Sequence, residues 1–167
     1  MKKFMITIVI LSAISLLSCT PGSVVTGAAA RIIPTSGNDA SGIVTFQQEG
    51  NMVTITGEIT GLAPGNHGFH IHEKGDMTEM DGTSAGGHYN PLEVDHGRPS
   101  DRIRHIGDLG NITADNNGRA VIDKTDTVIR LNGIYSIIGR AVVVHADPDD
   151  FSPPTGNAGP RVGFGVI

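Results

Sequence analysis

Residues 43–59 read IVTFQQEGNMVTITGEI, and this stretch indicates the fold class. From residue 52 to residue 59, apolar and polar side chains alternate, which is typical of a strand that buries one face. The side chains expected on the buried face are Val53, Ile55 and Ile59. Residues 43–47 are rich in β-branched and aromatic side chains and predict a second strand. The turn sequence EGN at residues 49–51 would join the two strands as a hairpin.

Six further segments have strand-like patterns, and turn sequences rich in Gly, Pro, Asn and Asp separate them. They are residues 28–33, 68–74, 119–123, 128–132, 140–145 and 162–167. Residues 73–105 and 146–160 show no periodicity, and unstructured loops of this length are uncommon in compact domains unless they have a function. We therefore expect an all-β domain, a Greek-key β-barrel or sandwich of about eight antiparallel strands with two long functional loops.

The composition limits the class of protein. A chain of 167 residues that is 38% hydrophobic suits one domain with its own core and excludes a disordered chain. The net charge of −5 argues against nucleic acid as a partner, because phosphate binding requires a basic surface. The single cysteine excludes an intramolecular disulfide, a CxxC redox pair and a cysteine-based zinc finger.

The N-terminus has the features of a targeting segment. Two lysines precede an apolar run at residues 4–17, which is shorter than the roughly 20 residues that span a membrane. The run ends in the sequence LLSC at residues 16–19, which resembles a bacterial lipobox. In such signals the cysteine, here Cys19, is acylated and becomes the first residue of the mature protein. The alternative is an ordinary cleaved signal with an incidental cysteine.

This interpretation divides the chain into three parts. Residues 1–18 are a lipoprotein signal peptide, residues 19–27 a lipid-anchored flexible tether, and residues 28–167 the folded domain. Loss of the signal removes two lysines and leaves ten basic and 17 acidic residues, a net charge of −7. We expect an exported bacterial lipoprotein that Cys19 anchors to a membrane, on the periplasmic side or on the outer face of the cell membrane.

Six of the seven histidines lie in or next to predicted strands or within the first long loop. They are His70, His72, His88, His96, His105 and His145, and Asp108 follows the fifth of them by three residues. Because side chains alternate along a strand, His70 and His72 should share one face. Imidazole binds zinc and copper, and a carboxylate beside three histidines suits zinc. One histidine alone more often has a structural role, but the pattern predicts a metal site that orders the loop.

The motifs around these histidines resemble those of the copper–zinc superoxide dismutases. GFHIHEKGD at residues 68–76 resembles their copper-binding strand, and TSAGGHYNP at residues 83–91 resembles the segment with their bridging histidine. HIGDLGN at residues 105–111 matches their last two zinc ligands. IGRAVVVH at residues 138–145 matches the strand that ends in their fourth copper ligand, and GNAGPR at residues 156–161 matches the segment with their active-site arginine.

The resemblance implies one copper ion and one zinc ion per subunit. The implied copper ligands are His70, His72, His88 and His145. The implied zinc ligands are His88, His96, His105 and Asp108, so that His88 bridges the two ions. Asp149 matches a carboxylate that hydrogen-bonds one histidine of each metal, the alternative being one solvated acid among three on its loop. His67 is expected to pack and hydrogen-bond locally.

The implied reaction is the conversion of superoxide to oxygen and hydrogen peroxide by copper redox cycling. His88 would take up and deliver a proton while zinc holds it in position, and Arg161 would guide the anion. A homodimer is compatible with the resemblance. The alternative is a non-catalytic metal-delivery or metal-buffering module on the same fold, which the presence of all seven ligands and Arg161 disfavours. A purely structural β-sandwich lipoprotein would not explain the spacings.

The chain departs from the family in two respects. Residues 146–160 contain three aspartates and no lysine where family members place lysines, so we expect weaker electrostatic steering of the substrate. The positions that correspond to the family disulfide hold Gly82 and Phe164, so no disulfide is expected. Metal binding should then provide more of the order of the long loop.

Overall fold

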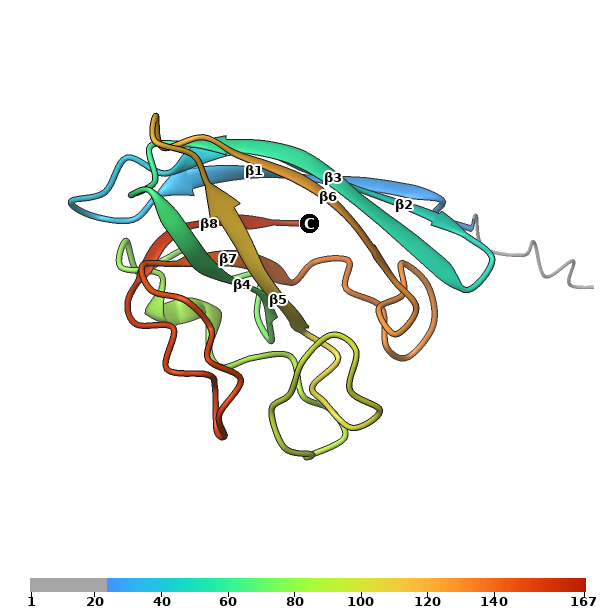
Figure 1. The fold of residues 1–167 in the computed structure, drawn as a ribbon. Helices are drawn as coiled ribbons and strands as arrows, with labels where there is room; N and C mark the ends of the chain where they lie inside the picture. The colour runs from blue at the N-terminus through green and yellow to red at the C-terminus, as the bar shows by residue number, and fades with distance from the viewer. Residues whose placement is uncertain (1–23) are drawn as a thin grey trace, which may run out of the picture.

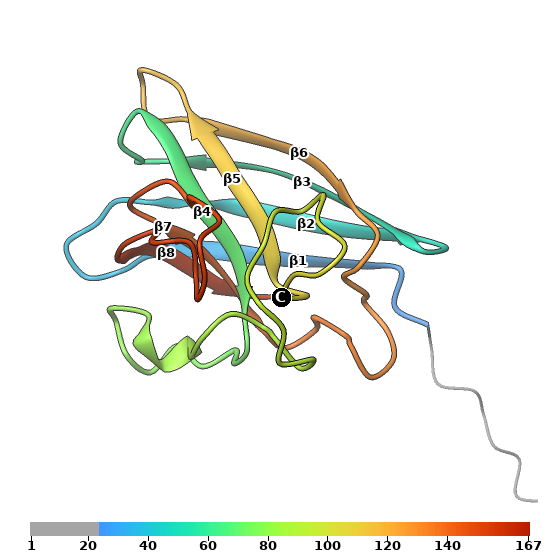
Figure 2. The same ribbon diagram turned by 60° about the horizontal axis from the view of Figure 1, so that its bottom comes forward.

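The computed structural model describes residues 24–167, in which eight antiparallel strands close into a barrel (Figures 1 and 2). The strands are β1 (Gly27–Pro34), β2 (Ser41–Glu49), β3 (Met52–Thr60), β4 (Gly65–His72), β5 (Asp108–Ala114), β6 (Ala120–Asp126), β7 (Ala141–His145) and β8 (Arg161–Val166). Their order around the barrel is β1-β2-β3-β6-β5-β4-β7-β8. Because β7 returns to lie beside β4 after the consecutive strands β4, β5 and β6, the topology is a Greek key. The predicted fold class is confirmed, in its barrel form.

The hairpin predicted from residues 43–59 is confirmed as β2 and β3, which pair along their whole length. The predicted inward side chains Val53, Ile55 and Ile59 are fully buried. They join a core inside the barrel that also contains Phe46, Phe69 and Ile71. Alternation along β2 and β3 therefore places one face of this hairpin in the core and leaves the other largely exposed to solvent.

Seven of the eight predicted strands are confirmed, with ends shifted by a few residues. The strand predicted at residues 128–132 is wrong, because this segment belongs to a loop between β6 and β7. Its apolar side chains Ile129 and Leu131 are buried, but the backbone has no partner strand there. The prediction missed β5, whose first residues fall inside the motif read as a metal-binding sequence.

Three long connections lie outside the barrel, at residues 73–107, 127–140 and 146–160. The first and third extend on the side of β4 and β7 (Figure 1), and the first contains a 3-10 turn, η1 (Thr83–Ala85). Ala85 of this turn packs in a second apolar cluster against Ala141, Val143 and Phe164. This cluster holds the first loop on the outer face of β7 and β8. It includes Phe164, one of the two positions that correspond to the family disulfide.

The predicted signal peptide at residues 1–18 and Cys19 lie outside the described residues. At the end of the predicted tether, the backbone N–H of Val25 donates to the Asn132 side chain at 2.9 Å, and that side chain donates back to the Val25 carbonyl at 2.7 Å. In residues 24–167, no helix has the length and apolar character needed to cross a membrane.

Candidate metal centre

The site is built on the outer face of β4, where His70 and His72 flank Ile71, whose side chain lies in the barrel core. The Ile71 N–H donates to the Gly107 carbonyl at 2.9 Å, and the Ile71 carbonyl accepts from Tyr89 N–H at 2.8 Å. These bonds hold the middle and the end of the long loop against β4. A Cβ atom at Gly107 would lie 2.1 Å from the Ile71 carbonyl oxygen, so this close approach requires glycine.

Four buried histidines form the first group of donors. They are His70, His72, His88 and His145. The Nδ1 atom of His72 lies 2.9 Å from the Gly86 carbonyl, and Nδ1 of His145 lies 3.0 Å from the Gly159 carbonyl. Because a carbonyl only accepts, each Nδ1 donates, which leaves the two Nε2 atoms 3.3 Å apart as lone-pair donors to a metal. The buried Nδ1 atom of His70 has no hydrogen-bond partner, which also fits a metal ligand.

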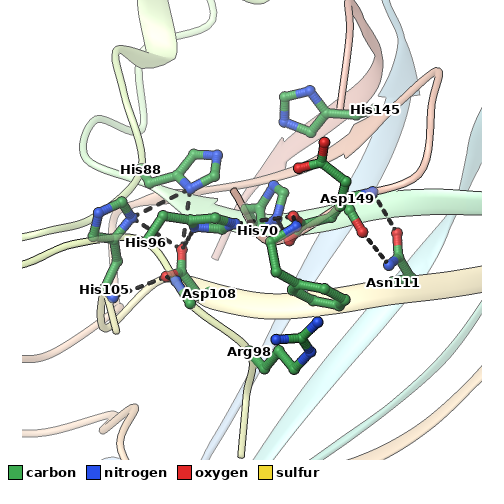
Figure 3. A network of polar contacts seen from close by, with 12 residues as sticks. His70, His88, His96, Arg98, His105, Asp108, Asn111, His145 and Asp149 are labelled. Carbon is green, nitrogen blue, oxygen red and sulfur yellow. Dashed lines mark hydrogen bonds and ion pairs between the residues drawn. The ribbon is translucent and has the colours of Figure 1, made fainter. Parts of the chain in front are cut away.

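The second group shares His88 and surrounds one carboxylate (Figure 3). It consists of His88, His96, His105 and Asp108. The Nδ1 atoms of the three histidines lie 3.1, 2.9 and 3.0 Å from Oδ1 of Asp108, in that order. A tetrahedral zinc ion with bonds of about 2.0–2.1 Å separates its ligand atoms by roughly 3.3 Å. The donor set and its spacing therefore fit zinc.

Asp149 connects the two groups (Figure 3). Its Oδ2 atom accepts from Nε2 of His70 at 2.8 Å, and Oδ1 accepts from Nε2 of His96 at 2.9 Å. Asn111 holds Asp149 in turn, because its side chain donates to the Asp149 carbonyl at 2.9 Å and accepts from its N–H at 2.7 Å. A Cβ atom at Gly156 would lie 1.8 Å from Oδ1 of Asp149, so only glycine leaves room for the carboxylate.

The pKa values of His88 and His145 suit metal binding at neutral pH. Burial lowers the pKa of His88 to about 4 and that of His145 to about 3, so both are neutral and can donate a lone pair. Burial opposes the charge of Asp108 and Asp149, but hydrogen bonds from the histidines hold the pKa of both carboxyls far below its usual range. Burial also lowers the pKa of His96, but its bonds to the two carboxylates outweigh this and raise it to about 9, so His96 must release a proton when it binds a metal.

Arg104 braces the second group and was not identified from the sequence. Its buried guanidinium donates to the carbonyls of His105 at 3.1 Å and Asp108 at 2.9 Å, and it forms an ion pair with Asp126. Asp126 also accepts from the backbone N–H groups of residues 128 and 129. The pair thus ties the segment that carries two of the donors to the end of β6. The only feature of the sequence that points to this role is the position of Arg104, a cation, directly before the predicted zinc ligand His105.

Arg161 lines a cavity of about 230 Å³ together with histidines of the first group. The residues that line the cavity include His72, His88, His145, Thr155, Asn157 and Arg161. Among these lining residues, Arg161 carries the one positive side chain, in agreement with the missing lysines. Its guanidinium donates to the carbonyls of Gly82 and Gly86, which fixes its position.

The two remaining sequence expectations concern His67 and the loop. His67 belongs to neither donor group, and its ring nitrogens lie 2.8 Å from the His145 carbonyl and 2.7 Å from the Ala63 carbonyl, as a structural role requires. Residues 24–167 contain no cysteine. The loop that was expected to depend on metal is also held by Arg161 and by the apolar cluster around Phe164.

The two donor groups share His88 and define the class of proteins that bind two metal ions through one common histidine. Residues 40–167 match the model of the family described as copper/zinc superoxide dismutase (SODC). The chain is 47% identical over 152 residues to "Extracellular superoxide dismutase [Cu-Zn]" from Brugia pahangi, an alignment that covers 85% of this chain and 76% of the relative. The chain therefore belongs to the copper–zinc superoxide dismutase family. The predicted family, oxidoreductase class and copper and zinc cofactors are confirmed.

Proposed function

We propose that this chain converts superoxide to oxygen and hydrogen peroxide, with one copper ion and one zinc ion per subunit. The proposed copper ligands are His70, His72, His88 and His145, and the proposed zinc ligands are His88, His96, His105 and Asp108. The observation that carries the proposal is the position of His88 in both donor groups. When bound, copper supplies one-electron redox chemistry and zinc, which has none, supplies a fixed positive charge.

Arg161 recruits and orients the anion. Its guanidinium is always charged at physiological pH and lines the same cavity as His72 and His145. The carbonyls of Gly82 and Gly86 accept from the guanidinium, so that little side-chain freedom is lost when the substrate binds.

His88 is the proposed proton carrier. It lines the substrate cavity, and its Nδ1 atom lies 3.1 Å from Asp108, on the zinc side. Its other nitrogen, Nε2, is then the one that can hold a proton for the peroxide product. Asp149 acts as a positioning residue, because it fixes the ring orientation of one histidine in each group.

The experiment that tests this function compares superoxide consumption by the metal-loaded protein and its Arg161→Gln and Arg161→Lys variants. We expect Arg161→Gln to lower the second-order rate constant by about tenfold or more, and Arg161→Lys to retain a larger part of the rate because the charge remains. Equal rates in all three proteins would exclude this role. Stoichiometric copper and zinc without superoxide consumption would instead indicate a metal-buffering module.

The export proposal rests on the sequence. We propose a signal peptide at residues 1–18, lipidation of Cys19, a tether at residues 19–27 and a catalytic domain at residues 28–167, in a bacterial lipoprotein at the periplasmic side or outer face of the membrane. The relative from Brugia pahangi is described as extracellular, which agrees with export. Mass spectrometry of the mature N-terminus tests the assignment, and Cys19→Ser should release the protein from membranes. The homodimer remains a prediction, and sedimentation analysis of the purified protein would test it.

A further inference from the structure

The loops at residues 73–107 and 146–160 meet at two neighbouring contacts beside the second group of donors. The first is the hydrogen bond from Nε2 of His96 to Oδ1 of Asp149, at 2.9 Å. The second lies two residues further along each loop, where the guanidinium carbon of Arg98 is 4.7 Å from the centre of the Phe151 ring (Figure 3). A cation over the face of an aromatic ring is attracted by the electrons of the ring. The stacked pair therefore adds a second tie between the loops, next to the bond that orients His96.

Phe151 has a backbone conformation that is unfavourable for its residue type. Its φ of 65° lies in the left-handed region, which large side chains adopt rarely because of steric strain. In this conformation its N–H donates at 2.8 Å to Oδ1 of Asp149, the same oxygen that accepts from His96. Its ring packs on β5, since a Cβ atom at Gly110 would lie 3.0 Å from Pro99 and 3.7 Å from the ring. Such strain persists only where the surrounding contacts hold it, and here those contacts lead to the Asp149 carboxylate.

Arg98 is fixed to the other loop through backbone contacts. Its N–H donates to the Asp101 side chain at 2.8 Å, and the N–H of the preceding residue, Gly97, donates to Oδ2 of Asp108 at 3.2 Å. One residue earlier, Nδ1 of His96 lies 2.9 Å from Oδ1 of Asp108. Arg98 is thus the end of a short segment that carries one proposed zinc ligand and is bonded to another.

We propose that Arg98 and Phe151 are positioning residues for the zinc side of the centre, which act as a clamp that holds the two loops around the Asp149 carboxylate. The inference rests on the zinc ligands proposed above. A carboxylate that supports a metal-bound histidine fixes the orientation of the ring, and its loss typically weakens metal binding about 10–100-fold. The clamp acts on this carboxylate from outside, so its loss should speed zinc release by a smaller factor, about three to ten.

Four variants separate the charge and the aromatic ring from side-chain bulk. Phe151→Leu keeps an apolar side chain without the ring, and Arg98→Met keeps a long side chain without the charge. Phe151→Tyr keeps the ring and should behave like the unmodified protein, whereas Arg98→Lys keeps the charge without the planar guanidinium and should fall between Arg98→Met and the unmodified protein. The matched control is Arg102→Met, which removes an exposed arginine from the same loop.

Two measurements on the full chain report on the zinc side. Transfer of zinc to a chromophoric chelator gives the rate of zinc release, and cobalt(II) in place of zinc gives visible absorption bands that depend on the geometry of its ligands. We expect Phe151→Leu and Arg98→Met to release zinc about three to ten times faster and to alter the cobalt bands, and Arg102→Met to do neither. The double variant should release zinc hardly faster than either single variant, because both substitutions remove the same contact.

Zinc release and cobalt bands that stay unchanged in Phe151→Leu would overturn the proposal, and a lower urea unfolding midpoint alongside them would leave the pair a role in stability alone. Additive effects in the double variant would also overturn it, since the two residues would then act separately. If the unmodified chain failed to bind one zinc or cobalt ion, the proposed zinc ligands would fall together with the clamp. Superoxide consumption in the same samples tests the catalytic proposal independently.

Discussion

Replacing Arg104 by methionine tests whether the buried ion pair organises the zinc side of the centre. The substitution leaves the Asp126 carboxylate without its cation and removes the donor to the carbonyls of His105 and Asp108. Breaking a buried pair in this way typically costs 3–5 kcal/mol. Two backbone N–H groups continue to bond Asp126, so we expect a loss of about 4 kcal/mol rather than more.

Urea unfolding of the chelator-treated and zinc-loaded protein measures this loss, and competition with a chromophoric chelator measures zinc affinity. Zinc should bind about 10–100-fold more weakly, as when a group that supports ligands is removed. The control is Arg119→Met, which breaks an exposed pair with Glu58 at 2.6 Å and should cost little stability because solvent screens the pair. The double variant Arg104→Met/Asp126→Leu should recover stability, since no unpaired charge remains. A cost for Arg104→Met as small as that of the control, or unchanged zinc affinity, would refute the reasoning.

Three further predictions follow from the site. In chelator-treated protein, the low pKa values of His88 (about 4) and His145 (about 3) make the unfolded chain bind more protons below pH 6.5. Stability should therefore fall as the pH is lowered from 6.5 to 4, by at most about 2.7 kcal/mol per pH unit from these two groups. The raised pKa of His96, about 9, contributes stability that is fully present below pH 6.5 and is lost as the pH rises through 9. Urea unfolding midpoints that rise as the pH is lowered from 6.5 would contradict the trend expected for His88 and His145. A zinc chelator should weaken hydrogen-exchange protection within residues 73–105, whereas a thiol reductant should change nothing, and equal protection with and without metal would show that packing alone orders the loop. Because residues 146–160 contain no lysine, the superoxide rate should decrease only weakly with ionic strength, and a steep decrease would reveal steering by other cations.

The sequence predicts the parts of the fold that depend on local pattern. The alternation of Val53, Ile55 and Ile59 is sufficient to place β3, because one face of the strand meets the core. The same kind of pattern misleads at Ile129 and Leu131, where a loop is attached to the core without a partner strand. Strand formation requires pairing with a distant segment, and alternation alone does not report on that pairing.

The residues of the candidate site can likewise be predicted only in part from the sequence. Histidine spacing and the family resemblance identify the side chains that the structure groups around His88. Neither identifies Arg104 or Asn111, because each acts on the site through backbone atoms or through a partner that is far away in the sequence. The cluster around Phe164 was also missed, although it helps to hold the long loop without a disulfide.

The most direct test of the account measures metal content and superoxide consumption together, in the protein and in its His145→Ala variant. His145 belongs only to the first donor group, whereas the second group contains four other residues. We expect one copper and one zinc ion per chain and rapid superoxide consumption in the unmodified protein. The variant should retain zinc and lose copper and activity. Full copper loading without activity in the unmodified protein, or undiminished activity in the variant, would contradict the account.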